Sequence, residues 1–113
     1  MSDRLPARVE ASALIRQAES NGGFGTILKR GDPDSGALVL LIAQKGVPIA
    51  LVERQMGQDF AYRWTATESG ESLRGNKFRD SLADRARFDP DFWLIELDIP
   101  DAERFIAETT SCS

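Results

Sequence analysis

The chain has 113 residues, 42% of them hydrophobic, and a formal net charge of −4 at pH 7. This length suits one domain that buries about two-thirds of the surface exposed by its unfolded form, so neither disulfides nor a structural metal is required. An acidic surface repels polyanions, and we therefore expect no nucleic-acid partner. The longest apolar run, 37–43, is too short to span a bilayer, and the single cysteine, Cys112, fits a reducing compartment, so the sequence predicts a cytoplasmic protein without membrane contact.

The first half of the chain predicts one helix followed by three strands. Residues 12–21 carry apolar side chains at helical spacing and end at two glycines, which favours an amphipathic helix. Residues 9–11 are expected to form either a short strand or an earlier turn of this helix. Residues 24–29 follow as a strand. The run 37–43 is apolar at every position, as expected for a central strand that is buried on both faces. A Lys-Gly turn at 45–46 then predicts that residues 48–52 return as an antiparallel partner.

The next segment predicts a further strand, a loop and a surface helix. Residues 60–65 alternate aromatic with smaller or polar side chains, which is typical of a strand. Residues 68–75 are polar and contain glycine and serine, so they predict a loop. From Phe78 to Ala86, apolar side chains recur at every fourth residue among charged ones, which indicates a surface helix.

The last segment predicts a strand with two different faces and a short helix. From Trp93 onward, alternate residues are apolar on one face, while Glu96 and Asp98 share the other face and need solvent or a cationic partner. A final helix is predicted over 101–108. The order of elements predicts an α+β fold with a largely antiparallel sheet of four to five strands and two or three helices.

These elements predict a single domain over 1–113. Its ordered core is expected to cover 5–108, and residues 109–113 are expected to form a flexible tail. Tail residues of this kind contribute little to a packed core.

The tripeptide Asp-Pro-Asp occurs twice, at 32–34 and 89–91. Proline fixes its own φ and disfavours a helical conformation of the preceding residue, and the carboxylates can accept hydrogen bonds from nearby backbone amides. We also expect Arg30 and Arg87 to pair with these carboxylates. We therefore interpret the following residues as structural turns: Asp32, Pro33, Asp34, Asp89, Pro90 and Asp91.

Two longer segments contain these turns, Lys-Arg-Gly-Asp-Pro-Asp-Ser-Gly at 29–36 and Arg-Phe-Asp-Pro-Asp-Phe-Trp-Leu-Ile-Glu at 87–96. With both, the chain resembles a bacterial family of small proteins named only as the domain of unknown function 1491. The similarity extends from Arg8 to about Phe105. It implies a cytoplasmic single-domain protein and supplies no catalytic residues. The stretch 56–75 departs from the family pattern, so the resemblance implies no site there.

The residue inventory excludes several kinds of active site. The chain has no histidine, which excludes Ser-His-Asp and Cys-His catalysis and every metal site that requires histidine. A Gly-Phe-Gly sequence at 23–25 begins like a dinucleotide loop, but Leu28 occupies the position of the third glycine. We therefore predict no cofactor and no bound metal.

Aromatic and basic residues suggest one candidate binding surface. Tyr62 and Trp64, with Arg54 and Arg63, could stack on a base or a peptide, because aromatic rings and guanidinium groups both suit flat ligands. Aromatic residues at alternate strand positions are more often part of the core. We therefore favour burial of Phe60, Tyr62 and Trp64.

An alternative function follows from the order of two acidic residues. Asp34 precedes the central strand and Glu53 ends the next one, which is similar to the Pro-Asp and Glu-x-Lys arrangement of metal-dependent nucleases. In such enzymes the two acids hold Mg²⁺ and a lysine orients the attacking water. Gln55 occupies the lysine position in this chain.

The preferred hypothesis is an uncharacterised, non-enzymatic module that binds another protein or a small ligand, with a homodimer through sheet edges or helix faces as a further option. The alternative is a Mg²⁺-dependent phosphodiesterase that uses Asp34 and Glu53.

Overall fold

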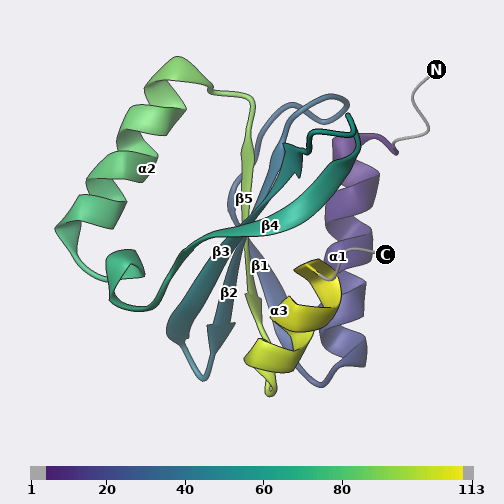
Figure 1. The fold of residues 1–113 in the computed structure, drawn as a ribbon, viewed down its shortest axis with the longest axis vertical. Coiled ribbons are helices and arrows are strands. Elements are labelled where there is room, and N and C mark those ends of the chain that lie inside the picture. The colour runs from purple at the N-terminus through teal and green to yellow at the C-terminus, as the bar shows by residue number, and fades with distance from the viewer. Residues whose placement is uncertain (1–4, 111–113) are drawn as a thin grey trace.

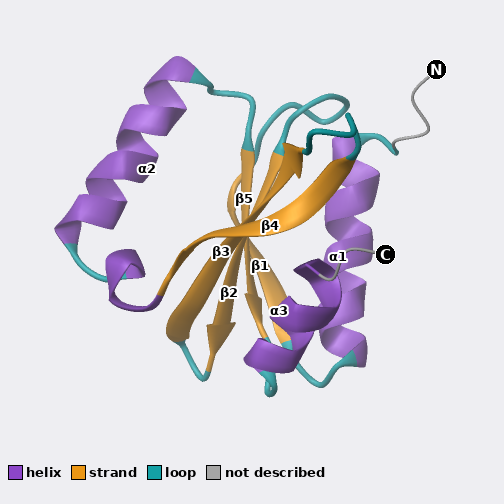
Figure 2. Ribbon diagram, viewed as in Figure 1, coloured by secondary structure: helices purple, strands orange, loops and turns teal. Residues whose placement is uncertain are grey.

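Five strands form one sheet that lies between helices on both faces (Figures 1 and 2). The computed structural model describes residues 5–110. The elements are, in chain order, α1 Ala7–Ser20, β1 Phe24–Lys29, β2 Leu38–Gln44, β3 Val47–Met56, β4 Tyr62–Ser69, the 3-10 helix η1 Gly70–Leu73, α2 Asn76–Phe88, β5 Trp93–Asp98 and α3 Ala102–Thr110.

The strand order is β1-β5-β2-β3-β4, so the last strand is inserted between the first two. β5 is parallel to β2 and antiparallel to β1, and the other neighbours are antiparallel. The predicted α+β fold with a mostly antiparallel sheet is confirmed. The predicted hairpin is confirmed as well, with Leu41 opposite Leu51.

Each face of the sheet has its own hydrophobic core. α1 and α3 cover one face, which we call the α1 face, and α2 with η1 covers the other, the α2 face (Figure 1). The two predicted sides of β5 are confirmed, because Trp93 and Ile95 belong to the α1-face core and Leu94 to the α2-face core.

Several predicted boundaries differ from the structure. α1 begins at Ala7 instead of residue 12, since its first amides are satisfied by tertiary contacts: Ala7 N–H donates to Asp34 O at 3.1 Å and Arg8 N–H to Pro33 O at 2.8 Å. β4 begins at Tyr62 and continues to Ser69, through the start of the predicted loop. That loop also contains η1, whose Leu73 is buried in the α2-face core.

The C-terminal helix is longer than expected. α3 continues to Thr110, where Thr110 Oγ1 donates to Ile106 O at 2.7 Å. The rest of the predicted tail, including Cys112, lies outside the described residues. None of the helices between residues 5 and 110 combines the length and the apolarity that crossing a membrane requires.

The two Asp-Pro-Asp segments lie against one another. Asp32 N–H donates to Asp91 O at 2.9 Å, and Trp93 Nε1 donates to Asp32 O at 2.7 Å. A Cβ built on Gly31 or Gly36 would lie 2.0 or 2.2 Å from the same Asp91 oxygen, so both positions require glycine. The repeated tripeptide therefore forms one joint between the β1–β2 connection and the start of β5.

Asp98 has a different partner from the one expected. Its carboxylate accepts hydrogen bonds from Lys45 N–H at 3.0 Å and Gly46 N–H at 2.8 Å, so it braces the β2–β3 turn. In this turn Lys45 has a φ of 52° and Gly46 a φ of 78°. Two backbone amides thus bind this carboxylate.

Candidate functional site

The end of the sheet at which β1 ends and β5 begins gathers residues that are far apart in the sequence. We call it the turn end; it holds the segments 30–37 and 89–92 and the N-terminus of α1 (Figure 1). Asp32 braces the first segment, because its Oδ2 accepts from Ser35 N–H at 2.8 Å, Ser35 Oγ–H at 2.9 Å and Asp34 N–H at 3.1 Å. These bonds, those of Ser35 foremost, hold the pKa of the Asp32 carboxyl below its ordinary value.

The arginines near the two turns do not have the predicted partners. Asp34 pairs with Arg8 of α1 at 2.7 Å, instead of with Arg30. Arg87 pairs with Asp84 on α2, and the Arg30 guanidinium lies 5.3 Å from the centre of the Trp93 ring. α1 supplies the cation at the first turn because its N-terminus docks there.

One flank of α1 is basic. Arg8, Ser12 and Arg16 follow one another at four-residue intervals and are all exposed. Because an α-helix has 3.6 residues per turn and rises 1.5 Å per residue, the three side chains form a row about 12 Å long. The row lies beside the buried stripe of α1, which includes Ala11 and Leu14.

This row borders a groove of about 410 Å³, which we call the arginine groove. Its apolar surface comes from α1, from β1 and from the first residue of β5. Arg30, at the end of β1, supplies a third guanidinium. The lining residues are Arg8, Val9, Ala11, Ser12, Arg16, Ile27, Arg30 and Trp93.

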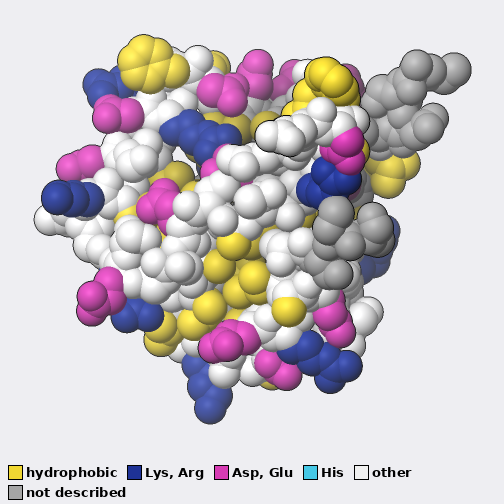
Figure 3. Space-filling model, in the orientation of Figure 1, with side chains coloured by type: hydrophobic (Ala, Val, Ile, Leu, Met, Phe, Trp, Pro, Cys, Tyr) yellow, Lys and Arg dark blue, Asp and Glu magenta, His cyan; other side chains and the backbone are white. Residues whose placement is uncertain are grey.

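Every charged residue that lines the arginine groove is an arginine. The ion pair of Arg8 with Asp34 is exposed, at 55% and 74% for the two side chains, so it contributes little and can exchange for a ligand. Arg30 has a cation–π contact with Trp93. Within residues 5–110, Arg16 has no ion pair. The groove is therefore locally positive, whereas positive and negative side chains are interspersed on the face shown in Figure 3.

The predicted aromatic surface is divided in the structure. Arg54 stacks on Trp64 at 4.5 Å and pairs with Glu10 of α1 at 2.6 Å, with both charged side chains less than one-fifth exposed. Arg63 lies opposite Gln55 in the β3–β4 register and thus points away from α1. Arg54 and Trp64 therefore form a packed unit, which Arg63 does not join.

The expected burial of the aromatic residues is wrong for two of the three. Trp64 packs against the α1-face core, but Tyr62 is 56% exposed and Phe60 is 81% exposed at the β3–β4 turn. Phe60 has a φ of 64°, so this turn fixes its backbone and leaves the ring outside. Arg63 pairs with Asp59 across the turn, and its hydrogen bonds hold the pKa of Asp59 well below its usual range.

Asp34 and Glu53, the two acids of the alternative catalytic site, form ion pairs with arginines of two different helices. Glu53 accepts from Arg85 of α2 at 2.7 Å and from Thr67 Oγ1 at 3.0 Å, whereas Asp34 pairs with Arg8 of α1. α1 and α2 cover opposite faces of the sheet. The described residues contain no group of three or more acidic, cysteine or histidine side chains suited to a metal ion. Gln55 is exposed on β3.

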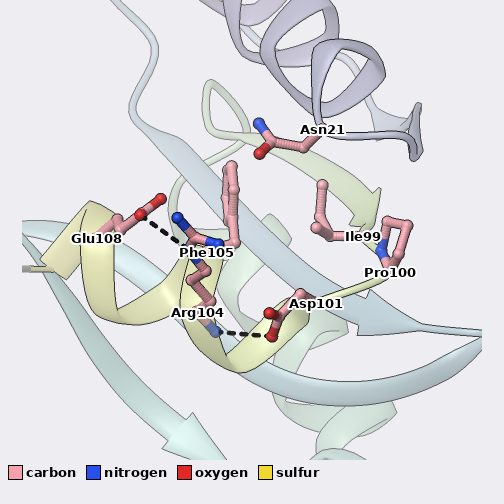
Figure 4. A pocket seen from close by; sticks show the side chains of 7 residues that line it. All are labelled: Asn21, Ile99, Pro100, Asp101, Arg104, Phe105 and Glu108. Carbon is pink, nitrogen blue, oxygen red and sulfur yellow. Dashed lines mark hydrogen bonds and ion pairs between the residues drawn. The ribbon is translucent and has the colours of Figure 1, made fainter.

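Another cavity, of about 260 Å³, lies between α3 and the end of α1 (Figure 4). Its one arginine, Arg104, donates through Nε to Glu108 at 3.2 Å, and its backbone amide donates to Asp101. A further cavity, of about 190 Å³, contains Arg54 and Arg85. Since these two arginines also pair with carboxylates, the arginine groove offers the least compensated positive charge of the three cavities.

The arginine groove was not predicted from the sequence. The helix was expected to begin at residue 12, so Arg8 fell outside it and the row of Arg8, Ser12 and Arg16 was missed. The spacing Arg-x3-Ser-x3-Arg was the available signal. The position of Arg30 opposite this row depends on how α1 packs against β1 and could not be predicted from spacing.

Comparison with known proteins supports the fold. A family described as "Protein of unknown function (DUF1491)" matches residues 5–107. A crystal structure of a DUF1491 family protein from Caulobacter crescentus CB15 is 28% identical, covers 90% of this chain and 94% of that one, and has a TM-score of 0.72. An NMR structure of a DUF1491 family protein from the same organism is 29% identical, with coverages of 87% and 88% and a TM-score of 0.67.

The solution structure of protein Atu0922 from A. tumefaciens is also similar. It is 25% identical, covers 84% of this chain and 86% of that one, and has a TM-score of 0.69. No curated protein matches the chain.

Proposed function

Because the chain belongs to the DUF1491 family, whose function is unknown, we propose a function from its own geometry: a non-enzymatic module that binds an anionic ligand in the arginine groove. The observation that carries this proposal is the convergence of Arg8, Arg16 and Arg30 on one groove with an apolar floor. Guanidinium groups bind carboxylates and phosphates through paired hydrogen bonds, and the apolar floor suits the uncharged part of such a ligand.

The size of the groove and the net charge of the chain limit which kinds of anion can bind. A net charge of −4 opposes long polyanions, while the local field of three arginines still attracts a compact anion or a short acidic segment. We keep the cytoplasm as the proposed compartment, on the basis of cysteine use and of the family resemblance.

The alternative of a Mg²⁺-dependent phosphodiesterase gains no support from this arrangement. Asp34 and Glu53 each pair with an arginine, and these arginines come from helices on opposite faces of the sheet. Two acids that hold one metal ion between them need a common position.

Calorimetric titration with citrate and with inorganic phosphate at low ionic strength tests the proposal. We expect binding by the wild-type chain and at least a tenfold loss of affinity in Arg16→Gln combined with Arg30→Gln, because two of three guanidinium groups are removed. Arg79→Gln on α2 removes an exposed charge away from the groove and should leave affinity unchanged. Equal affinity in all variants, or no binding of either anion, would contradict the proposal.

A further inference from the structure

The arginine groove lies close to an unpaired strand edge. β1 is the outermost strand and pairs only with β5, and within residues 5–110 no strand occupies its outer side. α1 lies close above it, since a Cβ on Gly25 would be 2.8 Å from Ile15 Cγ1. Further along β1, Ile27 lines the groove. The groove therefore runs between the basic flank of α1 and the free edge of β1.

The two sides of β1 differ in character. Ile27 faces α1 and packs against the α1-face core. Phe24 and Thr26 lie opposite Asp98 and Glu96 and thus face the other side, where Phe24 is 56% exposed. Leu28, at the bulge that shifts the register between Ile27 and Lys29, is 49% exposed. The free edge of β1 thus has the arginines of α1 and Arg30 near one side and exposed apolar side chains of β1 on the other.

We infer that the ligand of this groove is an extended peptide segment that pairs with the free edge of β1 and alternates acidic with apolar residues. The inference rests on the proposed function and names its ligand. Addition of a strand to an open edge satisfies backbone groups of both partners, and side chains then supply specificity. Acidic residues of the segment face Arg8, Arg16 and Arg30, and the alternate residues lie beside Phe24 and Leu28.

Spacing and charge both support this register. The row from Arg8 to Arg16 is about 12 Å long, and a strand covers about 13 Å in four residues, so acidic residues at i, i+2 and i+4 match its length. An acidic side chain on the opposite side of the added strand would lie on the face of Glu96, which excludes the shifted register by repulsion. The acidic side chains of the bound peptide therefore point toward α1, and its apolar side chains point toward the α2 face.

Fluorescence anisotropy with labelled peptides tests the inference. The probe is Glu-Val-Glu-Val-Glu-Val, acetylated and amidated, and the control Glu-Glu-Glu-Val-Val-Val has the same composition without alternation. We expect the alternating peptide to bind at least tenfold more tightly. Arg16→Gln with Arg30→Gln should weaken its binding, and Arg79→Gln should not.

Backbone methylation of the probe tests strand pairing directly. Successive N–H groups of a strand point to opposite sides, so only one alternate set can donate to β1. We therefore compare two methylated peptides, one with methyl groups on the three Glu amides and one with methyl groups on the three Val amides. We expect one of the two peptides to lose binding and the other to keep it. A Phe24→Asp variant should also weaken binding, because the apolar contact becomes a repulsive carboxylate.

The outcomes separate this inference from the proposed function. Equal binding of both peptides, or tolerance of both methylated forms, would overturn strand pairing, even if the arginine variants still weaken binding. Binding of citrate without binding of any peptide would overturn the peptide ligand and leave the anion site. A wild-type dimer in sedimentation that Phe24→Asp dissociates would assign the β1 edge to a second copy and overturn the inference.

Discussion

Individual carboxylates in this chain mostly organise backbone and arginines. Asp32 accepts three hydrogen bonds from the turn that follows it, and Asp98 accepts two from the β2–β3 turn. Asp89 accepts from Asp91 N–H at the longer distance of 3.3 Å. Acidic residues that could be metal ligands by their sequence pattern therefore stabilise turns by accepting hydrogen bonds from backbone amides. Arg16 of α1, in contrast, has no ion pair within residues 5–110 and is exposed.

The brace at Asp32 predicts a particular dependence of stability on pH. Because the pKa of Asp32 is lowered in the folded chain from 3.8, the ionised carboxylate stabilises the fold above that pH, and the stabilisation is lost as the pH falls through the folded pKa. We expect Asp32→Asn to melt below wild type at pH 7, with a difference that shrinks toward pH 3.

Thermal melts between pH 3 and pH 7 measure this difference. Asp80→Asn, on the exposed surface of α2, is the matched control for the change of charge. Parallel curves for wild type and Asp32→Asn over the whole range would show that Asp32 does not act through its ionised form.

The pair of Arg54 and Glu10 predicts strong coupling. Both side chains are less than one-fifth exposed, so removal of one partner leaves the other poorly solvated. We expect Arg54→Ala to lower the free energy of unfolding by about 3 kcal/mol, including the lost stacking on Trp64. The double variant with Glu10→Ala should recover part of that loss in urea unfolding. If the free-energy losses of the two single variants add up to the loss of the double variant, Arg54 and Glu10 are not coupled.

At the scale of elements, the joint between the two Asp-Pro-Asp segments places α1, β1 and β5 relative to one another. The first segment receives the N-terminus of α1, and its Asp32 bonds to Asp91 and Trp93 at the start of β5. The position of Arg30 relative to Arg8 and Arg16 follows from this joint. The arginine groove therefore depends on the joint that directly adjoins Arg30 and Arg8.

A glycine substitution tests the joint. A Cβ on Gly31 would lie 2.0 Å from Asp91 O, so Gly31→Ala must separate the two segments, and we expect it to cost about 3 kcal/mol of unfolding free energy. Gly70→Ala is the control: its Cβ would meet open space, and its φ of 64° alone should cost about 1 kcal/mol. If chemical denaturation shows the same loss of unfolding free energy in both variants, the two Asp-Pro-Asp segments are not in close contact at Gly31.

The sequence predicted those elements whose partners are local. The β2–β3 hairpin was correct because a two-residue turn determines its pairing, and the sides of β5 were correct because alternation determines burial. The start of α1 was wrong because Pro33 and Asp34, far along the chain, accept its first amides. The exposure of Phe60 follows from a left-handed turn that β-propensity does not report. The groove was missed because Arg30 meets α1 only through this tertiary packing.

On the scale of the whole molecule, a mildly acidic chain places three arginines, Arg8, Arg16 and Arg30, in one groove near the outer strand β1. In the cavity beside α3, by contrast, Arg104 pairs with Glu108 of the same helix. We therefore assign the function of this chain to the binding of a ligand in the arginine groove between α1 and β1.

Amide chemical-shift mapping during titration with citrate tests this account most directly, because it locates the anion without assuming its site. We predict that the largest shifts occur at Arg8, Ser12, Arg16, Ile27 and Arg30, and that they disappear in Arg16→Gln combined with Arg30→Gln. Shifts centred instead on Arg104 and its cavity, or spread evenly over the surface, would contradict the assignment of the arginine groove as the binding site.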